Sequence, residues 1–372
     1  MPAMKRKSVL VMLHPLSLPR LEAIFEYARQ HEWAIILQDR MPKDFDFGLL
    51  DGALVTFRGR SEQTDVVQAL LRLGKPVVDL TAACDKPPLT RVSSDHAAIG
   101  RLAAQHFLER GFEHFAWYSS SWSNVHRLRY GGYRESVGKR TRIARAVGGE
   151  SALARLLARA KRPLAVLTFD ETDGSLAIRA CQRAGLAVPF DVAVLAVGND
   201  PFLCENASIP LSSVDQGLRQ GALAAAAILD RMMATGRTSH PKTTLIPPVR
   251  VVSRTSTDTL AHPHPTIRQA LNFIHLNLAK SLTASQVAAA VGVPRSTLDH
   301  LFTAQTGRTV GREIVRQRLL RAKRLLRDET IQLKSIAKLC GFCHAAHFTN
   351  AFKSETGQTP KAWRTTLIPD FS

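Results

Sequence analysis

The sequence lacks any apolar run that approaches the length of about 20 residues needed to cross a membrane. It holds only five cysteines in 372 residues, and this odd number favours reduced thiols and a cytoplasmic location. Acidic residues are also scarce, because 31 Asp and Glu stand against 50 Lys and Arg and leave a formal net charge of +19. Such an excess indicates a polyanionic partner, either nucleic acid or an anionic membrane.

Two motifs of enzyme chemistry are absent. No glycine-rich phosphate loop opens a helix, and no Gly-x-Ser-x-Gly turn presents a nucleophile. The spacing of Cys340, Cys343, His344 and His347 could mimic a zinc cluster, but no second cysteine pair accompanies them. We interpret them as two thiols beside groove-facing histidines. The sequence therefore favours a protein that is not an enzyme and needs no metal and no cofactor.

The positive charge is concentrated near the C-terminus. Residues 264–372 hold 16 Lys and Arg against 6 Asp and Glu, a net charge of +10, which leaves +9 for the much longer remainder. A solvated basic face would give the same count, so charge alone does not prove anion binding. It does make the C-terminal third the stronger candidate for contact with a nucleic acid.

The first two thirds of the chain alternate short apolar runs with amphipathic helical patterns. This alternation, with glycine or proline at the breaks, predicts parallel α/β layers. The candidate strands are 9–13, 34–37, 52–56, 76–79, 114–118, 164–168 and 192–197, and the candidate helices are 18–30, 64–73, 97–110, 173–184 and 217–234.

Polar side chains follow several of these strands. Asp170 comes after one strand, Asn199 and Asp200 after the next, and Arg129 lies beyond the strand that ends at Tyr118. Ligands of parallel sheets bind beyond the carboxyl ends of the strands, and carboxylates and guanidinium groups can each engage two hydroxyl groups of a sugar. Taken singly, each residue is better explained as a loop cap or a surface ion pair.

An ordered series of motifs resembles the LacI and periplasmic sugar-binding family over residues 8–258. The motifs are Val92-Ser93-Ser94-Asp95-His96, Arg129-Tyr130-Gly131-Gly132-Tyr133, Gly198-Asn199-Asp200, Leu211-Ser212-Ser213-Val214-Asp215-Gln216 and the closing stretch 246–257. The resemblance implies a two-lobed, type I periplasmic-binding-protein-like α/β domain. It also implies that Arg129, Asp170, Asp200 and Gln216 contact a small-molecule effector.

The sequence departs from this family in two places. The stretch 135–164 is short for the start of a second lobe, so we expect an edge strand to be missing there. The N-terminal DNA-binding segment of LacI proteins is also absent, since the strand pattern begins at Val9.

A proline-containing segment without apolar periodicity, residues 258–265, predicts a linker, and a repeated helical pattern follows it. Val287, Gly292, Leu298 and Phe302 recur as Ile336, Gly341, Phe348 and Phe352, with the offset rising from 49 to 50 at the turn. A repeated helix–glycine turn–helix is typical of helix-turn-helix motifs, whose second helix enters the major groove. Thr283 and Gln286 predict a capping box, and 313–327 predicts a long joining helix.

The second copy resembles the signature of the AraC family over about residues 266–366. The two resemblances predict an effector domain at 1–257 and an all-α DNA-binding domain with two helix-turn-helix motifs at 266–372. Of the exposed side chains, those expected to read base edges are Arg295, Ser296, Asp299, His300, His344, Ala345, His347 and Asn350. Those expected to meet phosphate are Arg312, Arg316, Lys353 and Lys361. A solvated helix face explains any one of these cations equally well.

The resemblance implies a transcription regulator that binds double-stranded operator DNA and acts as a homodimer with RNA polymerase. It also implies a sugar effector, a pentose and first of all xylose. One alternative is the same architecture with another sugar or small molecule. The other is a sugar-modifying enzyme with a DNA-binding tail, for which the sequence offers no acid–base pair.

Overall fold

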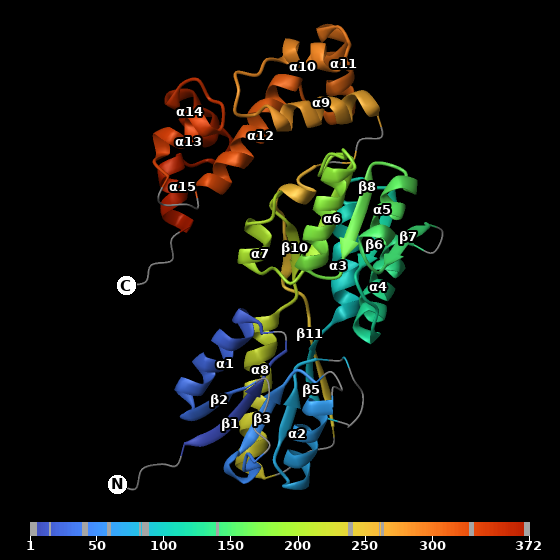
Figure 1. The fold of residues 1–372 in the computed structure, drawn as a ribbon. Helices are drawn as coiled ribbons and strands as arrows, with labels where there is room; N and C mark the ends of the chain where they lie inside the picture. The colour runs from blue at the N-terminus through green and yellow to red at the C-terminus, as the bar shows by residue number, and fades with distance from the viewer. Residues whose placement is uncertain are drawn as a thin grey trace. The chain divides into compact units, whose positions relative to one another are not determined.

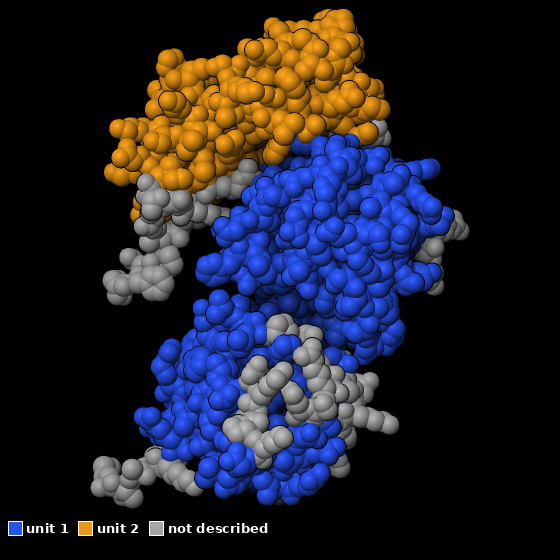
Figure 2. Space-filling model, in the orientation of Figure 1, with its two compact units in different colours: residues 1–260 blue, residues 261–372 orange. Residues whose placement is uncertain are grey.

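The computed structural model describes residues 6–14, 16–38, 44–57, 61–81, 83, 89–138, 141–236, 241–259, 261, 264–326 and 331–367. The chain forms two compact units, residues 1–260 and 261–372 (Figure 2). Leu260, His262 and Pro263 of the predicted linker, Arg327 of the predicted joining helix, and Cys84 lie outside the described residues.

The first unit begins with a parallel sheet in the strand order β11-β5-β4-β3-β1-β2 (Figure 1). Its strands are β1 (Lys7–Met12), β2 (Trp33–Leu37), β3 (Gly52–Val55), β4 (Val77–Asp79), β5 (Thr90–Ser94) and β11 (Thr243–Ile246). The accompanying helices are α1 (Leu18–Gln30), α2 (Ser61–Arg72) and α8 (Leu218–Thr235), with a short 3-10 turn at Phe47–Leu49. Most of these strands are buried on both faces, as strands between two helical layers must be.

The second sheet has the strand order β12-β10-β9-β8-β6-β7. Its strands are β6 (His114–Ser119), β7 (Ile143–Val147), β8 (Leu164–Thr168), β9 (Val192–Val197), β10 (Ser212–Asp215) and β12 (Arg250–Val252), of which β12 runs antiparallel to β10. Its helices are α3 (His96–Leu108), α4 (Asn124–Val137), α5 (Glu150–Arg159), α6 (Glu171–Arg183) and α7 (Pro201–Glu205), and a 3-10 turn spans Thr255–Thr257.

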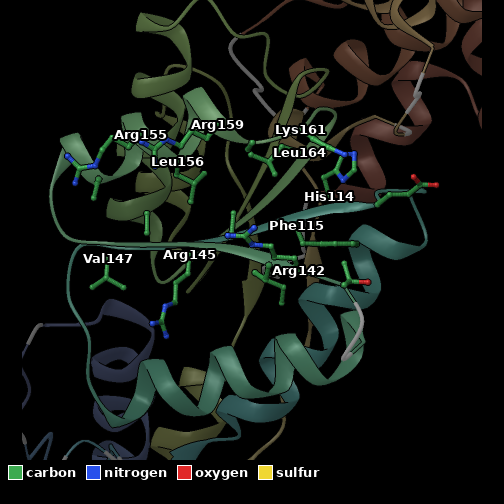
Figure 3. A pocket seen from close by; sticks show the side chains of 17 residues that line it. His114, Phe115, Arg142, Arg145, Val147, Arg155, Leu156, Arg159, Lys161 and Leu164 are labelled. Carbon is green, nitrogen blue, oxygen red and sulfur yellow. The ribbon is translucent and has the colours of Figure 1, made fainter.

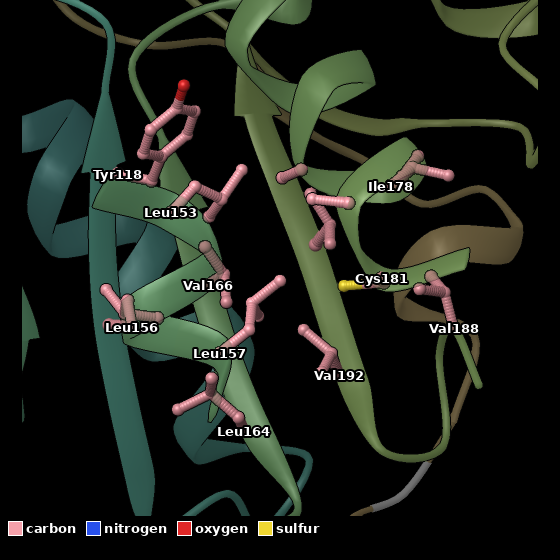
Figure 4. Close-up of a cluster of buried hydrophobic side chains, with 14 of the residues drawn as sticks. Tyr118, Leu153, Leu156, Leu157, Leu164, Val166, Ile178, Cys181, Val188 and Val192 are labelled. Atoms are coloured by element: carbon pink, nitrogen blue, oxygen red, sulfur yellow. The ribbon is translucent and has the colours of Figure 1, made fainter. Parts of the chain in front are cut away.

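The core of this second lobe lies between its sheet and the helices α5 and α6 (Figure 4). Leu153 and Leu157 of α5 and Ile178 of α6 contact Val166 of β8 and Val192 of β9, and all five are buried. The opposite face of β9 is buried as well, because every residue of Val192–Val197 is inaccessible to solvent. A strand buried on both faces is held rigidly, and so are the residues at its carboxyl end.

Three chain segments connect the two sheets, at Asp95, at Gln216 and at 247–249. They are hydrogen-bonded to one another: the Asp95 amide donates to the Ile246 carbonyl at 2.7 Å, and the Val249 amide donates to the Asp215 carbonyl at 2.8 Å. The Ser94 hydroxyl donates to the carbonyl of Gln216 at 3.0 Å. The connections therefore form one small hydrogen-bonded bundle beside the carboxyl ends of both sheets.

The expectation of a missing edge strand in the stretch 135–164 is wrong. The structure places β7 there, pairing with β6 in parallel register, and α5 follows it. The strand was overlooked because its sequence, Ile-Ala-Arg-Ala-Val, carries an arginine at its centre and has no long apolar run. At a sheet edge one side of the strand meets solvent, so such a composition is compatible with pairing.

Glycines allow α3 and α4 to pack backbone to backbone. A Cβ atom on Gly132 would lie 2.0 Å from the carbonyl oxygen of Ala97, and one on Gly100 would lie 2.1 Å from that of Arg129. A Cβ atom on Gly131, by contrast, would meet nothing within 4 Å. This close approach fixes the position of α4, and with it the position of Arg129.

We expect Gly132→Ala to destabilise the first unit by about 1–3 kcal/mol or more, because a backbone carbonyl must move to admit the methyl group. The matched control, Gly131→Ala, should be neutral or stabilising by about 0.5–1 kcal/mol, since alanine is the better helix former. Urea unfolding of both variants measures the difference. Equal stability of the two would contradict this packing.

The second unit is all-helical and contains the predicted repeat (Figure 1). Its helices are α9 (Pro265–Leu276), α10 (Ala284–Ala290), α11 (Arg295–Thr306), α12 (Val310–Leu325), α13 (Leu333–Leu339), α14 (Ala345–Thr356) and α15 (Pro360–Leu367). The starts of α10 and α13 are 49 positions apart, whereas those of α11 and α14 are 50 apart. The second turn is therefore one residue longer, as the sequence predicts.

The local signals of the repeat are confirmed. Thr283 and Gln286 form the capping box of α10, and Gly307 and Gly357 end α11 and α14 in the left-handed conformation. Phe302 and Phe352 are fully buried at matching positions. The predicted fold class, a two-lobed α/β domain followed by a double helix-turn-helix, is the observed one.

Candidate functional site

Arg129 is the centre of the polar residues beside the inter-lobe connections. It lies on α4, is 3% exposed, and donates from Nη2 to Oε1 of Gln216 at 3.3 Å. The same nitrogen is 3.3 Å from Nδ1 of His96, and Nη1 donates to the carbonyl oxygen of Phe169. The guanidinium also stacks 4.6 Å from the centroid of the Phe169 ring. The structure thus brings Arg129 and Gln216 together.

The charge of Arg129 is retained although the side chain is buried. Burial lowers the pKa of Arg129 to about 10, against the opposing effect of Asp170 and Glu171, so the group stays protonated at neutral pH. The pKa of His96 is lowered to about 3 by burial and by Arg129, which keeps the imidazole neutral. Nε of Arg129 is buried and has no hydrogen-bond partner in the described part of the chain. Such an unused donor is available to a ligand.

Asp170 begins the helix that follows β8. Its carboxylate accepts a hydrogen bond from the amide of Asp173 at 2.9 Å and so caps α6. β8 and β9 are neighbouring parallel strands, so Asp170 and the loop 198–200 after β9 lie at the same edge of the sheet. Asp170 therefore caps a helix and also lies at the carboxyl edge of the sheet.

Asn199 and Asp200 form the loop after β9. Asn199 adopts a left-handed conformation with φ of 66°, and its side-chain oxygen accepts from Nη2 of Arg254 at 3.1 Å. Asp200 caps α7 by accepting from the amide of Phe202 at 2.8 Å. Both side chains are partly exposed, and among the described residues neither forms a hydrogen bond with Arg129.

Two residues that support this loop were not singled out from the sequence. Glu171 is 7% exposed and accepts from the amide of Asp200 at 2.8 Å, and its carboxylate fills the space where a side chain on Gly198 would lie. Arg254, also 7% exposed, donates to Asn199 and to the carbonyl of Leu211. Glu171 looks like an ordinary first-turn helix acid in the sequence. Only the spatial neighbourhood of β8 and β9 reveals its role.

Burial raises the pKa of Glu171 to about 7, with smaller contributions from Asp170 and Asp200. Because this folded-state pKa lies above that of an unfolded glutamate, the stabilising contribution is complete below about pH 4.5 and is lost as the pH rises through 7. Glu171→Gln keeps an oxygen acceptor for the Asp200 amide and cannot ionise. We expect the wild type to lose about 1–3 kcal/mol more stability than this variant between about pH 5 and 8. Urea unfolding at both pH values tests this, with the exposed Glu113→Gln as control, and parallel pH profiles of wild type and Glu171→Gln would contradict it.

The first reading helix of the second unit, α11, presents its predicted side chains to solvent. Arg295, Ser296 and His300 are exposed and Asp299 is half-buried, whereas Leu298 and Phe302 on the other face are buried. Arg295 lies 3.5 Å from Asp299 one turn on, an exposed pair that is easily exchanged for another partner.

The second reading helix, α14, is similar. His344, Ala345, His347 and Asn350 are all exposed, and Phe348 is buried. His347 makes an edge contact with the ring of Phe342, at 5.5 Å between centroids. The offset of 50 between α11 and α14 also pairs Thr349 with Asp299 and Lys353 with Thr303.

The four cations expected at phosphate differ in their surroundings. Arg312, Lys353 and Lys361 are exposed, and no ion pair involves them among the described residues. Arg316 instead donates two hydrogen bonds to the carboxylate of Glu313, from Nε at 2.9 Å and from Nη2 at 2.7 Å. The same carboxylate also accepts a hydrogen bond from the side-chain amide of Gln317. The geometry favours a structural role for Arg316 over contact with phosphate.

No group of metal-binding side chains occurs in the part of the chain that the structure describes, and Cys340 and Cys343 are not joined in a disulfide there. None of the described helices is long and apolar enough to span a membrane.

Comparison with protein families gives two matches in the order of the two units. A periplasmic binding protein-like domain matches residues 104–257, and a helix-turn-helix domain matches residues 287–366. The first lies in the first unit and contains Arg129, Asp170, Asn199, Asp200 and Gln216. The second contains α11 and α14.

Full-length relatives have the same arrangement. The xylose operon regulatory protein of Escherichia coli K12 is 28% identical over 368 residues, 92% of each chain, and that of Haemophilus influenzae is 26% identical over 75% of each. The solved structure of a xylose-binding transcription activator superposes with a TM-score of 0.80 at 26% identity, covering 98% of this chain and 99% of that one. A cellobiose-bound regulator, 21% identical with a TM-score of 0.54, shares the fold over 68% of this chain and 85% of its own.

Both units thus match regulators of transcription in sequence and in structure. The chain is a DNA-binding transcription regulator in which a periplasmic binding protein-like domain precedes a helix-turn-helix domain, and it is similar in both units to the xylose operon regulators.

Proposed function

We propose that this chain is a sugar-responsive regulator of a pentose utilisation operon, with xylose as its effector. The observation that carries the proposal is the end-to-end likeness to the xylose operon regulators and to the xylose-binding activator, which spans both units in the same order. Likeness in only one unit would have left the effector class or the DNA-binding role unsupported.

In this proposal the effector binds at the carboxyl edge of the second sheet. Arg129 and Gln216 supply donors and acceptors beside the inter-lobe connections, and Asp170, Asn199 and Asp200 supply oxygen atoms from the neighbouring strand ends. Sugar hydroxyls both donate and accept hydrogen bonds, so a mixed set of one buried cation and several oxygens suits them. The effector would close the lobes on the hydrogen-bonded connections and favour one arrangement of paired chains.

The DNA partner is proposed to be a double-stranded operator read in two successive major grooves, about 34 Å apart along the duplex. Arg295, Ser296, Asp299 and His300 of α11, with His344, Ala345, His347 and Asn350 at α14, would reach base edges. Arg312, Lys353 and Lys361 would contact phosphate. The regulator would act in the cytoplasm as a homodimer and as an activator that contacts RNA polymerase.

Titration calorimetry of the full-length chain with a panel of pentoses and hexoses tests the effector assignment. We expect saturable binding of D-xylose, weaker binding of other pentoses and none of hexoses. Binding of a hexose in preference to xylose would keep the architecture and change the effector. Turnover of any sugar in the panel would support the alternative of an enzyme with a DNA-binding tail.

A further inference from the structure

A hollow of about 940 Å³ lies at the free edge of the second sheet, away from the residues proposed to bind the sugar (Figure 3). β7 is the last strand in the order of that sheet, and α5 packs against it. Ala152 and Leu156 of α5 and Ala160 just after it form an apolar wall, together with Phe115 and Leu164 at the starts of β6 and β8. Pockets for small molecules occupy about 300–1,000 Å³, so the hollow is large enough for an organic ligand.

Five cations line this hollow. They come from one continuous stretch of the chain: Arg142 and Arg145 at β7, Arg155 and Arg159 on α5, and Lys161 after it. Among the described residues that line the hollow, Glu113 is the only acidic one, so the net charge of these residues is +4. Arg145 is partly engaged elsewhere, because its guanidinium lies 5.1 Å from the ring of Trp122.

The other four cations, Arg142, Arg155, Arg159 and Lys161, are exposed and have no ion pair within the described ranges. Arg155 and Arg159 are spaced i, i+4, an arrangement in which like charges destabilise a helix. The acid at the start of the helix, Glu150, pairs instead with Arg183 at 2.8 Å. The protein itself therefore leaves this positive charge uncompensated, and a bound anion would offset the repulsion.

The shape and chemistry of the hollow narrow the class of anion. Guanidinium forks match phosphate oxygens with two parallel hydrogen bonds, and the apolar walls suit an organic group attached to the phosphate. Duplex DNA would meet the cations at the rim and leave the apolar walls hydrated. A second copy of this surface would bring five cations against five, which disfavours self-association.

We propose that this hollow is a second ligand site that takes an organic polyphosphate of nucleotide size. Arg142, Arg155, Arg159 and Lys161 hold the phosphates, and the wall of α5 contacts the organic group. The site is separate from the sugar site, so its occupancy adds a second small-molecule input to the same lobe.

Titration calorimetry of the full-length protein with ATP, inorganic pyrophosphate and adenosine tests this proposal. We expect ATP to bind saturably at one site, pyrophosphate to bind more weakly, and adenosine to give no measurable binding. Arg155→Ala with Arg159→Ala should weaken ATP binding by about tenfold or more, through loss of two charge-assisted contacts. The matched control is Arg134→Ala with Arg179→Ala, which removes the same charge from exposed positions on α4 and α6 of the same lobe.

Circular dichroism serves to check that both double variants are folded. The variant Arg155→Gln with Arg159→Gln repeats the test, because glutamine and arginine have similar helix propensities. Three outcomes would overturn the proposal. The first is the absence of saturable ATP binding by the wild type. The second is an equal loss in the variant and its control, which would mean delocalised charge. The third is tighter binding of polyglutamate than of ATP at the same arginines, which would reassign the surface to an acidic protein partner.

Discussion

We expect replacement of Arg129 by methionine to remove the response to sugar and to leave DNA binding intact. Methionine fills much of the same buried volume but lacks the donors that reach Gln216 and Phe169 and the unused Nε. A hydrogen bond from a charged donor contributes about 1.5–3 kcal/mol, and loss of two of them to a sugar predicts a fall in affinity of about a hundredfold or more. The DNA-reading helices lie in the other unit and keep their structure.

Calorimetry with D-xylose and gel shifts with operator DNA measure the two properties separately. Arg134→Met is the control, since Arg134 is exposed on the same helix and should leave both unchanged. Urea unfolding establishes that Arg129→Met is folded. Unchanged sugar affinity in a folded Arg129→Met protein would exclude Arg129 from the effector site.

We expect the combined change Arg295→Ala with Asn350→Ala to abolish most of the preference for operator over random DNA. Each residue is exposed on a reading helix, at the start of α11 and on the second turn of α14. An arginine or asparagine that bonds a base edge contributes about 1–3 kcal/mol of discrimination, so the double variant should lose about 2–6 kcal/mol. Fluorescence anisotropy with operator and random duplexes gives the ratio directly.

The control for this pair is Lys353→Ala with Lys361→Ala. Both lysines are exposed and without an ion pair in the described helices. Phosphate contacts carry no sequence information, so this variant should weaken binding to both duplexes equally and reduce the salt slope by about 2. Equal losses on both duplexes for Arg295→Ala with Asn350→Ala would place those residues on the backbone instead.

The strands that could be predicted from the sequence are those with apolar runs. The structure has two of them, Leu164–Thr168 and Val192–Val197, with the predicted bounds. β10 was missed because Ser212 and Ser213 are not apolar, although both are fully buried. Their hydroxyls are satisfied internally: Ser212 bonds Arg254 and Thr257, and Ser213 accepts from the Asn199 amide. Hydroxyls paired in this way are compatible with burial, and periodicity cannot reveal them.

The helical repeat could be predicted more completely, because its signals are local. The capping box at Thr283 and the C-terminal glycines Gly307 and Gly357 act within one helical turn. The change of offset between the two helices of each motif follows directly from the amino-acid sequence. The effector site depends on longer-range neighbours. The contact of Arg129 with Phe169 joins α4 to the end of β8, and that of Glu171 with Asp200 joins two strand ends 29 positions apart.

In the proposed mechanism, a sugar bound in the first unit changes how the second unit binds DNA. The most direct measurement is the affinity of the full-length wild-type protein for operator DNA with and without saturating D-xylose, by fluorescence anisotropy at fixed salt. A coupled regulator predicts a change of about 5- to 150-fold, the range of typical coupling free energies, with the reciprocal change in xylose affinity when DNA is bound. Identical DNA affinity and identical salt slope with and without xylose would contradict the account.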